Sequence, residues 1–133
     1  MKTAPTIQMY MALVVQTVEA GETLKTAEEM MTRKAIRHLP VMQKGQVIGI
    51  VSDRDVKLAG SIMGSEADKL PVIDVCNQNP YKVRVDAPVG EVAAKMAEKH
   101  YGSVLVMDGE KLVGIFTTVD ACRVLADLIK LKF

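Results

Sequence analysis

The sequence predicts an α+β fold made of two β-α-β-β-α repeats that pack about a pseudo-twofold axis. Two observations lead to this prediction. The chain of 133 residues repeats itself at a fixed shift of 65 positions, so that Gly49 falls on Gly114, and each repeat shows the same order of strand and helix patterns. Repeats this small bury surface poorly on their own, so we expect the two to pack against each other.

The repeat is clearest at a seven-residue motif: glycine, two hydrophobic residues, Ser or Thr, any two residues, and Asp. The shift carries residues 49–55 onto residues 114–120 without a gap. The match continues to the N-terminus, so we expect the opening residues, which resemble a short signal peptide, to belong to the mature fold. We place the first repeat at 1–63 and the second at 64–133, with residues 59–71 as the linker.

Each repeat begins with a short strand, predicted at 16–20 and at 81–85, and an amphipathic helix follows it. Thr23 is suited to cap the first of these helices. Apolar residues recur at helical spacing in both helices: Leu24, Ala27, Met31 and Ala35 in the first, and Val89, Val92, Ala93, Met96 and Ala97 in the second. This spacing predicts a buried stripe on each helix, in which methionine fills the core.

A hairpin and a second helix complete each repeat. Apolar runs flank a glycine-bearing turn twice: 39–42 with 47–51, and 104–107 with 112–116. Such runs around a turn predict β-hairpins. A further helix begins near Asp53 and another near Val119. Both are too apolar for one core face, so we expect them to form a second surface that makes the protein a homodimer.

Composition narrows the classes of function. Apolar residues make up 49% and charged residues 25%, which is typical of a globular domain. The net charge of +1, without a basic run, argues against a nucleic-acid partner. No apolar run approaches the roughly 20 residues of a membrane helix. Cys76 and Cys122 stand alone, so we expect two small buried side chains in a reducing cytoplasm.

The sequence offers no catalytic arrangement. His38 and His100 are not equivalent in the repeats and have no nearby partners at metal-ligand spacing. We find neither a nucleophile with its base nor a glycine-rich phosphate loop. Two repeats leave no residues for an enzymatic domain. We therefore expect no enzyme, no metal and no catalytic cofactor.

The repeated motif carries the chemistry of a binding site. It lies where a strand leads into a helix, and the N–H groups of a helix start favour an anion. Ser52 and Thr117 supply hydroxyl groups there, and Asp55 and Asp120 follow one helical turn later. A carboxylate at this place can accept both hydrogen bonds of a ribose diol. The same spacing also predicts a capping box, so the residues alone leave both interpretations open.

The order of elements, the Leu-Pro-Val run at 39–41 and the two motif copies together resemble a tandem CBS-domain protein, or Bateman module, over essentially the whole chain. The resemblance implies a regulatory module that binds an adenosine-containing ligand (AMP, ADP, ATP, NAD or S-adenosylmethionine) and signals to a protein target. Some pairs in the family bind no known ligand. The alternative is therefore a ligand-free scaffold for dimerisation or protein interaction.

The resemblance also implies two clefts built across the repeats. Site A would join the second motif (117–120) to residues 15–16 and 37–38, and site B would join the first motif (52–55) to 79–81 and 102–103. Asp55 and Asp120 would hold ribose. The phosphate would meet Ser52, Arg54, Thr117, Thr118, Arg37 and His38. The base would lie against Val15, Gln16, Asn79, Tyr81, Gly102 and Ser103.

Three features of the sequence bear on the site residues that the resemblance implies. The second repeat has Val-Leu-Val at 104–106 where the first has Leu-Pro-Val, which departs from the family pattern at site B. His38 has a structural alternative as a half-buried histidine at a helix end, bonded to the backbone. Tyr81 could pack against its own domain instead of stacking on a base.

Overall fold

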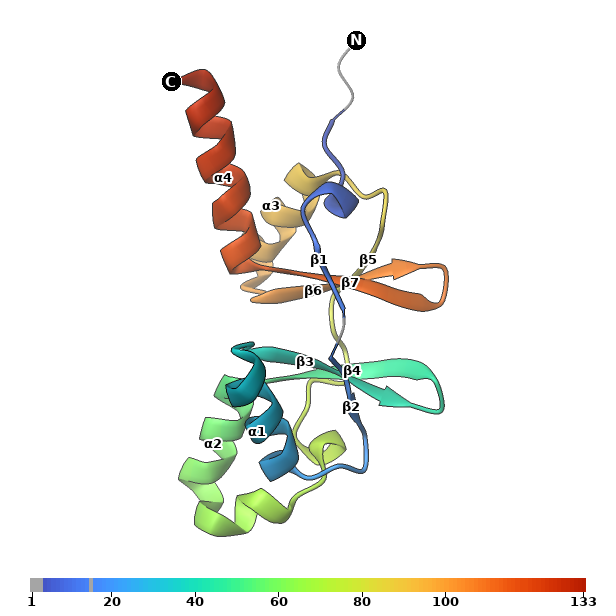
Figure 1. The fold of residues 1–133 in the computed structure, drawn as a ribbon, viewed down its shortest axis with the longest axis vertical. Helices are drawn as coiled ribbons and strands as arrows, with labels where there is room; N and C mark the ends of the chain where they lie inside the picture. The colour runs from blue at the N-terminus through green and yellow to red at the C-terminus, as the bar shows by residue number, and fades with distance from the viewer. Residues whose placement is uncertain (1–3, 15) are drawn as a thin grey trace. The chain divides into compact units, whose positions relative to one another are not determined.

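The computed structural model describes residues 4–14 and 16–133 (Figure 1). The chain divides into two compact units, one formed by Val15–Pro80 and the other by Met1–Val14 together with Tyr81–Phe133. Each unit contains a small sheet with helices beside it. The predicted α+β class and the order β-α-β-β-α are confirmed in both repeats.

The unit of Val15–Pro80 has a three-stranded sheet in the order β2-β3-β4. β2 (Val18–Glu19) runs parallel to β3 (His38–Gln43), and β3 pairs antiparallel with β4 (Gln46–Ser52). The β3–β4 turn has positive φ at both Lys44 and Gly45, the geometry of a tight hairpin. α1 (Leu24–Lys34) precedes the hairpin and α2 (Asp53–Met63) follows it.

The other unit has a four-stranded sheet in the order β1-β7-β6-β5. β1 (Ala12–Leu13) and β6 (Ser103–Asp108) both pair antiparallel with β7 (Lys111–Thr117), and β5 (Lys82–Arg84) runs parallel to β6. The helices are α3 (Val89–Lys99), before the hairpin, and α4 (Thr118–Lys132), after it.

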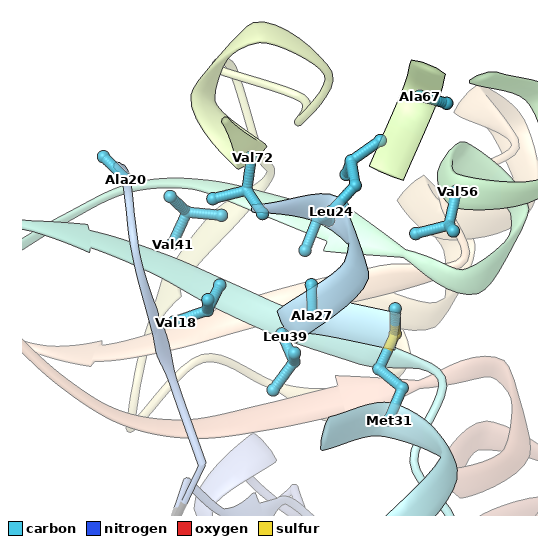
Figure 2. Packing of buried hydrophobic residues seen from close by; sticks show 11 residues of the cluster. Val18, Ala20, Leu24, Ala27, Met31, Leu39, Val41, Val56, Ala67 and Val72 are labelled. Atoms are coloured by element: carbon cyan, nitrogen blue, oxygen red, sulfur yellow. The ribbon is translucent and has the colours of Figure 1, made fainter. Parts of the chain in front are cut away.

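The core of the Val15–Pro80 unit lies between the sheet and α1, as Figure 2 shows. The helix buries Leu24, Ala27 and Met31, as their spacing predicts, and Thr23 caps it by accepting a hydrogen bond from the Thr26 N–H at 3.2 Å. Ala35 was expected on the same stripe and is not. It is exposed and ends the helix in the left-handed conformation, with φ 54°.

The second core repeats this arrangement. α3 buries Val89, Val92 and Met96 against the sheet, where Phe116 is the largest fully buried side chain. Ala97 is exposed, so the predicted stripe is one residue too long. The helix ends at His100 with φ 60°, at the position that corresponds to Ala35. Neither end has the glycine that usually signals this conformation in a sequence.

Each unit contains the opening segment of the other repeat. β1 pairs with Gly114 and Ile115 of β7, and Asn77, which is its equivalent 65 positions later, exchanges backbone hydrogen bonds of 3.0 and 2.9 Å with Ile50 of β4. Ile7 and Val72 are also equivalent, and both are 0% exposed, each in the core of the unit that holds the other repeat's helices. The compact units therefore do not coincide with the sequence repeats.

This exchange of opening segments between the two repeats explains why the repeated motif begins with glycine. A Cβ on Gly49 would lie 2.6 Å from the carbonyl oxygen of Asn77 and 2.9 Å from Cys76 Sγ. A Cβ on Gly114 would meet Met11 and lie 3.1 Å from the Ala12 carbonyl oxygen. The missing side chain makes room for the exchanged backbone.

Residues 59–71, predicted as the linker, are mostly helical. α2 continues to Met63, and a 3₁₀ segment follows at Gly64–Lys69. Ala67 in this segment is 3% exposed and belongs to the core. The burial of such apolar side chains outweighs the glycines that favoured a loop.

Candidate functional site

The two strand-to-helix turns are the candidate site, and the first is held by a capping box. β4 ends at Ser52 and α2 begins at the next residue. The Ser52 N–H donates to Asp55 Oδ2 at 2.8 Å, and the Asp55 N–H donates to Ser52 Oγ at 3.1 Å. The capping interpretation is therefore correct for this pair. Asp55 Oδ1 receives no hydrogen bond from the described residues.

The second turn holds its aspartate more tightly. Asp120 Oδ2 accepts hydrogen bonds from the Thr117 N–H at 2.8 Å and from the Thr117 hydroxyl at 3.2 Å. Asp120 Oδ1 accepts a third from Arg123 Nη1 at 3.1 Å. Asp120 is 8% exposed. Arg123 was not among the predicted site residues, although its spacing of three residues from Asp120 on a helix indicates a contact.

Strand pairing places other predicted residues beside these turns. His38 pairs with Ser52 across the hairpin, and the Arg37 carbonyl oxygen accepts a hydrogen bond from the Asp53 N–H at 3.0 Å. The family resemblance assigns Arg37 and His38 to the motif of the other repeat, and that assignment stays a prediction. Their nearest motif within this unit is their own, because a tight hairpin sets its first residue opposite its last.

The same relation holds in the second repeat. Ser103 pairs with Thr117, and the Thr118 N–H donates to the Gly102 carbonyl oxygen at 3.2 Å. Thus Gly102 and Ser103 also flank the motif of their own repeat. Counting residues outward from each hairpin turn predicts from the sequence that these residues flank the motif of their own repeat.

The first turn is the more cationic of the two. Arg37 and Arg54 are exposed, and neither forms an ion pair within the described part of the chain. His38 is half-buried, and burial lowers its pKa below the ordinary 6.5. The carboxylates of Asp53 and Asp55 act in the opposite direction on this pKa, and Arg37 lowers it further. The imidazole is therefore mainly neutral at pH 7.

The residues expected around a base are found in different settings. Tyr81 packs against Tyr101, with ring centroids 5.3 Å apart, and Lys95 Nζ lies 5.1 Å from the Tyr81 centroid. Burial raises the pKa of the Tyr81 hydroxyl. Packing is thus an observed role for this ring. Asn79 is exposed and Gln16 half-buried, while Val15 lies outside the described residues.

The cysteines differ from each other. Cys76 is half-buried, its thiol lies 3.7 Å from the Ile73 carbonyl oxygen, and burial raises the pKa of that thiol. Cys122 is exposed on α4, so the expectation that both are buried is wrong. In residues 4–14 and 16–133, no three His, Cys, Asp or Glu side chains gather where they could hold a metal.

None of the helices in the described ranges is long and apolar enough to span a membrane.

Together, two equivalent strand-to-helix turns with an aspartate at the third helical position define a tandem repeat of one small domain. The model of the CBS domain family matches residues 7–61 and 72–127, which is most of the chain. This protein belongs to the CBS domain family.

Curated relatives include both enzymes and short CBS proteins. A homoserine O-acetyltransferase from Methanococcoides burtonii is 32% identical over 114 residues, which cover 84% of this chain and 22% of that protein. An A-adding tRNA nucleotidyltransferase from Geobacter sulfurreducens is 29% identical, and the match covers 85% of this chain and 12% of the enzyme. A CBS domain-containing protein from Dictyostelium discoideum is 27% identical over 93% of both chains.

Solved structures share the fold over nearly the whole chain. An uncharacterized conserved protein from Pyrococcus horikoshii has a TM-score of 0.83 and 28% identity, covering 93% of this chain and 94% of that one. CBSX2 in complex with AMP has a TM-score of 0.80 and 23% identity, covering 92% and 97%. A CBS domain pair in complex with 5′-methylthioadenosine and S-adenosyl-L-methionine has a TM-score of 0.83 and 22% identity, covering 94% of this chain and 98% of that one.

Proposed function

We propose that this chain is a regulatory module that binds an adenosine-containing nucleotide at its strand-to-helix turns. The observation that supports it best is the state of Asp55. Its Oδ2 is fixed by the Ser52 N–H, whereas Oδ1 receives no bond from the described residues. The carboxylate is therefore oriented in advance and keeps one oxygen for ribose hydroxyl groups, so its capping and binding roles are compatible.

Side chains, more than backbone amides, are suited to meet the phosphate at the first turn. The N–H groups of Ser52, Asp53 and Asp55 already donate to other atoms. The exposed guanidinium groups of Arg37 and Arg54 remain, and a guanidinium binds phosphate through two parallel hydrogen bonds. His38 and the Ser52 hydroxyl complete the proposed phosphate contacts of this turn.

The second turn would offer Thr117, Thr118 and Asp120. We propose that the base at each turn lies against the opening residues of the opposite repeat, Val15 and Gln16 for one site and Asn79 and Tyr81 for the other, as the family resemblance implies. Gly102 and Ser103 would line the second turn. The ligand class is suggested by proteins of the same fold in complex with AMP and with S-adenosyl-L-methionine.

A regulatory role agrees with the relatives. In the two enzymes the matched part is a small fraction of the protein, 22% and 12%. We propose that the module performs no reaction and passes its ligand state to a protein target, as an adenosine-type ligand changes the populations of its conformations.

A scaffold without ligand is the second candidate, because the helices leave large apolar side chains exposed. Leu58 and Ile62 of α2 are 59% and 75% exposed, and α4 exposes Val119, Leu125, Leu128 and Ile129. We propose that a second copy of the chain covers these side chains and forms a homodimer. Light scattering at micromolar concentration should give twice the 14.5 kDa of one chain. A clean monomer would contradict the dimer.

Thermal unfolding separates the two candidates. The melting temperature is measured without ligand and with AMP, ATP, NAD or S-adenosylmethionine. A ligand at about 100 times its Kd adds about 2.7 kcal/mol to the free energy of unfolding, which a melting scan resolves. Asp55→Asn is the matched control, because it keeps the shape and weakens the bond to ribose. If no nucleotide raises the melting temperature, the scaffold is the better description.

A further inference from the structure

The two aspartates of the proposed nucleotide sites differ in how much of the carboxylate is available. Asp120 accepts three hydrogen bonds, from the Thr117 N–H, the Thr117 hydroxyl and Arg123. Among the residues that the structure describes, Asp55 accepts one, from the Ser52 N–H. The position equivalent to Arg123 in the first repeat is Leu58, which cannot donate. The difference thus comes from one residue pair related by the repeat.

We propose that Arg123 is a specificity-determining residue that closes the Asp120 site and makes it the weaker of two inequivalent nucleotide sites. This rests on the proposed function. A ribose diol has two hydroxyl groups to donate, and a carboxylate has about four lone-pair positions. With three positions taken at Asp120, only one remains. Both hydroxyl groups can bind there only after Arg123 leaves, whereas Asp55 can accept both at once.

The size of the effect follows from the exposure of the ion pair. The Arg123 side chain is 72% exposed, and its Nη1 lies 3.1 Å from Asp120 Oδ1. Exposed ion pairs contribute little because water and salt screen them and the arginine loses rotamer freedom. A ligand can therefore displace Arg123. We expect a substitution that removes the guanidinium to tighten ligand binding at Asp120 by about two- to fivefold.

Adenosine is the appropriate probe. It presents the ribose diol without a phosphate, so that a direct attraction between Arg123 and a phosphate cannot offset the release of Asp120. Site-resolved affinities come from an NMR titration that follows the amide signals of Ser52 and Thr117, since these two N–H groups donate to Asp55 and Asp120. One titration then reports both sites.

The variants exchange the two equivalent residues. In Arg123→Leu, the Thr117 signal should saturate at about two- to fivefold lower adenosine concentration, and the Ser52 signal should not change its midpoint. In Leu58→Arg, the new guanidinium is placed to reach Asp55, so the Ser52 midpoint should rise by a similar factor. Leu58→Gln is the control for polarity on α2, and light scattering on each variant controls for a change of assembly.

The outcomes separate this inference from the proposed function. If adenosine perturbs both signals but Arg123→Leu leaves the Thr117 midpoint unchanged, the role of Arg123 is refuted and the nucleotide site stands. If adenosine perturbs neither signal in any variant, at concentrations that saturate other nucleoside sites, both proposals fail. If the Thr117 site of the unaltered protein is the tighter one, the assigned order of the sites is wrong.

Discussion

The two strand-to-helix turns have the same backbone and different surroundings. Both keep a glycine, a hydroxyl residue and an aspartate, which are the residues that the exchanged segment and the helix start require. Several positions that would meet a ligand differ between the two turns: Arg54 against Val119, Arg37 against Gly102, His38 against Ser103, and Leu58 against Arg123. The repetition thus preserves the fold, and its exceptions give each turn a chemistry of its own.

A second contrast concerns the opening segments of the repeats. The predicted repeats meet between residues 63 and 64, whereas the compact units divide after Val14 and after Pro80. A residue near the N-terminus therefore stabilises the helices and strands of the second repeat, and the segment near Val72 stabilises those of the first. Substitutions test both this contrast and the contrast between the two turns.

Ile7→Ala should have the largest effect. Ile7 is fully buried among Val89, Val92 and Phe116, and truncating a buried isoleucine costs about 2–5 kcal/mol. Denaturant unfolding measures the loss, and hydrogen exchange shows where it falls. Protection should fall in Tyr81–Phe133 more than in Val15–Pro80. Met9→Ala, at an exposed side chain in the same segment, should change stability by less than about 0.5 kcal/mol. If protection against hydrogen exchange were lost only in Val15–Pro80, the exchange of opening segments between the two repeats would be refuted.

The two arginines of the first turn should distinguish ligands by charge. Arg37→Ala and Arg54→Ala should each weaken ATP binding by about 1.5–3 kcal/mol, because charge-assisted hydrogen bonds are lost, and should change adenosine binding little. Calorimetric titration with adenosine, AMP and ATP measures this. Arg33→Ala, an exposed arginine on α1, controls for net charge. Equal losses for all three ligands would mean that the arginines only support the fold.

The same titrations test the assignment of Arg37. The cleft arrangement drawn from the family places it at the turn of Asp120, whereas the hairpin register places it beside Ser52. We expect the ATP-induced shift of the Ser52 amide signal to weaken in both arginine variants. A loss at Thr117 in Arg37→Ala alone would instead support the cross-repeat arrangement.

Gly49→Ala should be destabilising because the added methyl group would meet the backbone of the exchanged segment. The nearest atom is the Asn77 carbonyl oxygen, which belongs to a hydrogen-bonded pair with Ile50 and cannot move freely. Overpacking of this kind costs about 1–3 kcal/mol. Gly60→Ala is the matched control, since it lies within α2 with open space around it and should be neutral or stabilising by up to about 1 kcal/mol. Similar effects of both substitutions on the urea midpoint would contradict this account.

The elements of the fold were predictable because each had a local signal. The hairpins follow from apolar runs around glycine turns, and the helix of Leu24–Lys34 follows from its spacing and the capping Thr23. The exchange had no such signal. β1 contains only two residues, and an ungapped repeat shows which segments are equivalent without showing which domain each one joins.

The geometry of the candidate site was predictable at the motif and less so around it. The capping bonds of Ser52 and Asp55 follow from a known spacing. The positions of Arg37 and His38 beside Ser52 depend on strand register, whereas the family resemblance implies a cross-repeat assignment that stays a prediction. The ion pair of Arg123 and Asp120 depends on a residue outside the motif whose equivalent in the first repeat is Leu58, so the repeat does not indicate it.

The smallest predicted effect is the pH dependence contributed by His38. Burial lowers its pKa in the folded chain below the unfolded value of about 6.5, so the unfolded chain binds the proton more readily. Stability therefore falls as pH drops from about 6.5 toward the folded pKa, and below that value the loss is complete. His38→Gln should lose less stability between pH 7.5 and pH 5.5 than the unaltered protein. His100→Asn, at the exposed end of α3, is the matched control. An identical pH profile in His38→Gln and the unaltered protein would show that burial of this imidazole has no effect on folding.

A contact between His38 and phosphate would act in the opposite direction, because AMP favours the protonated ring. With saturating AMP, the melting temperature of the unaltered protein should therefore fall less across this interval than it does without ligand.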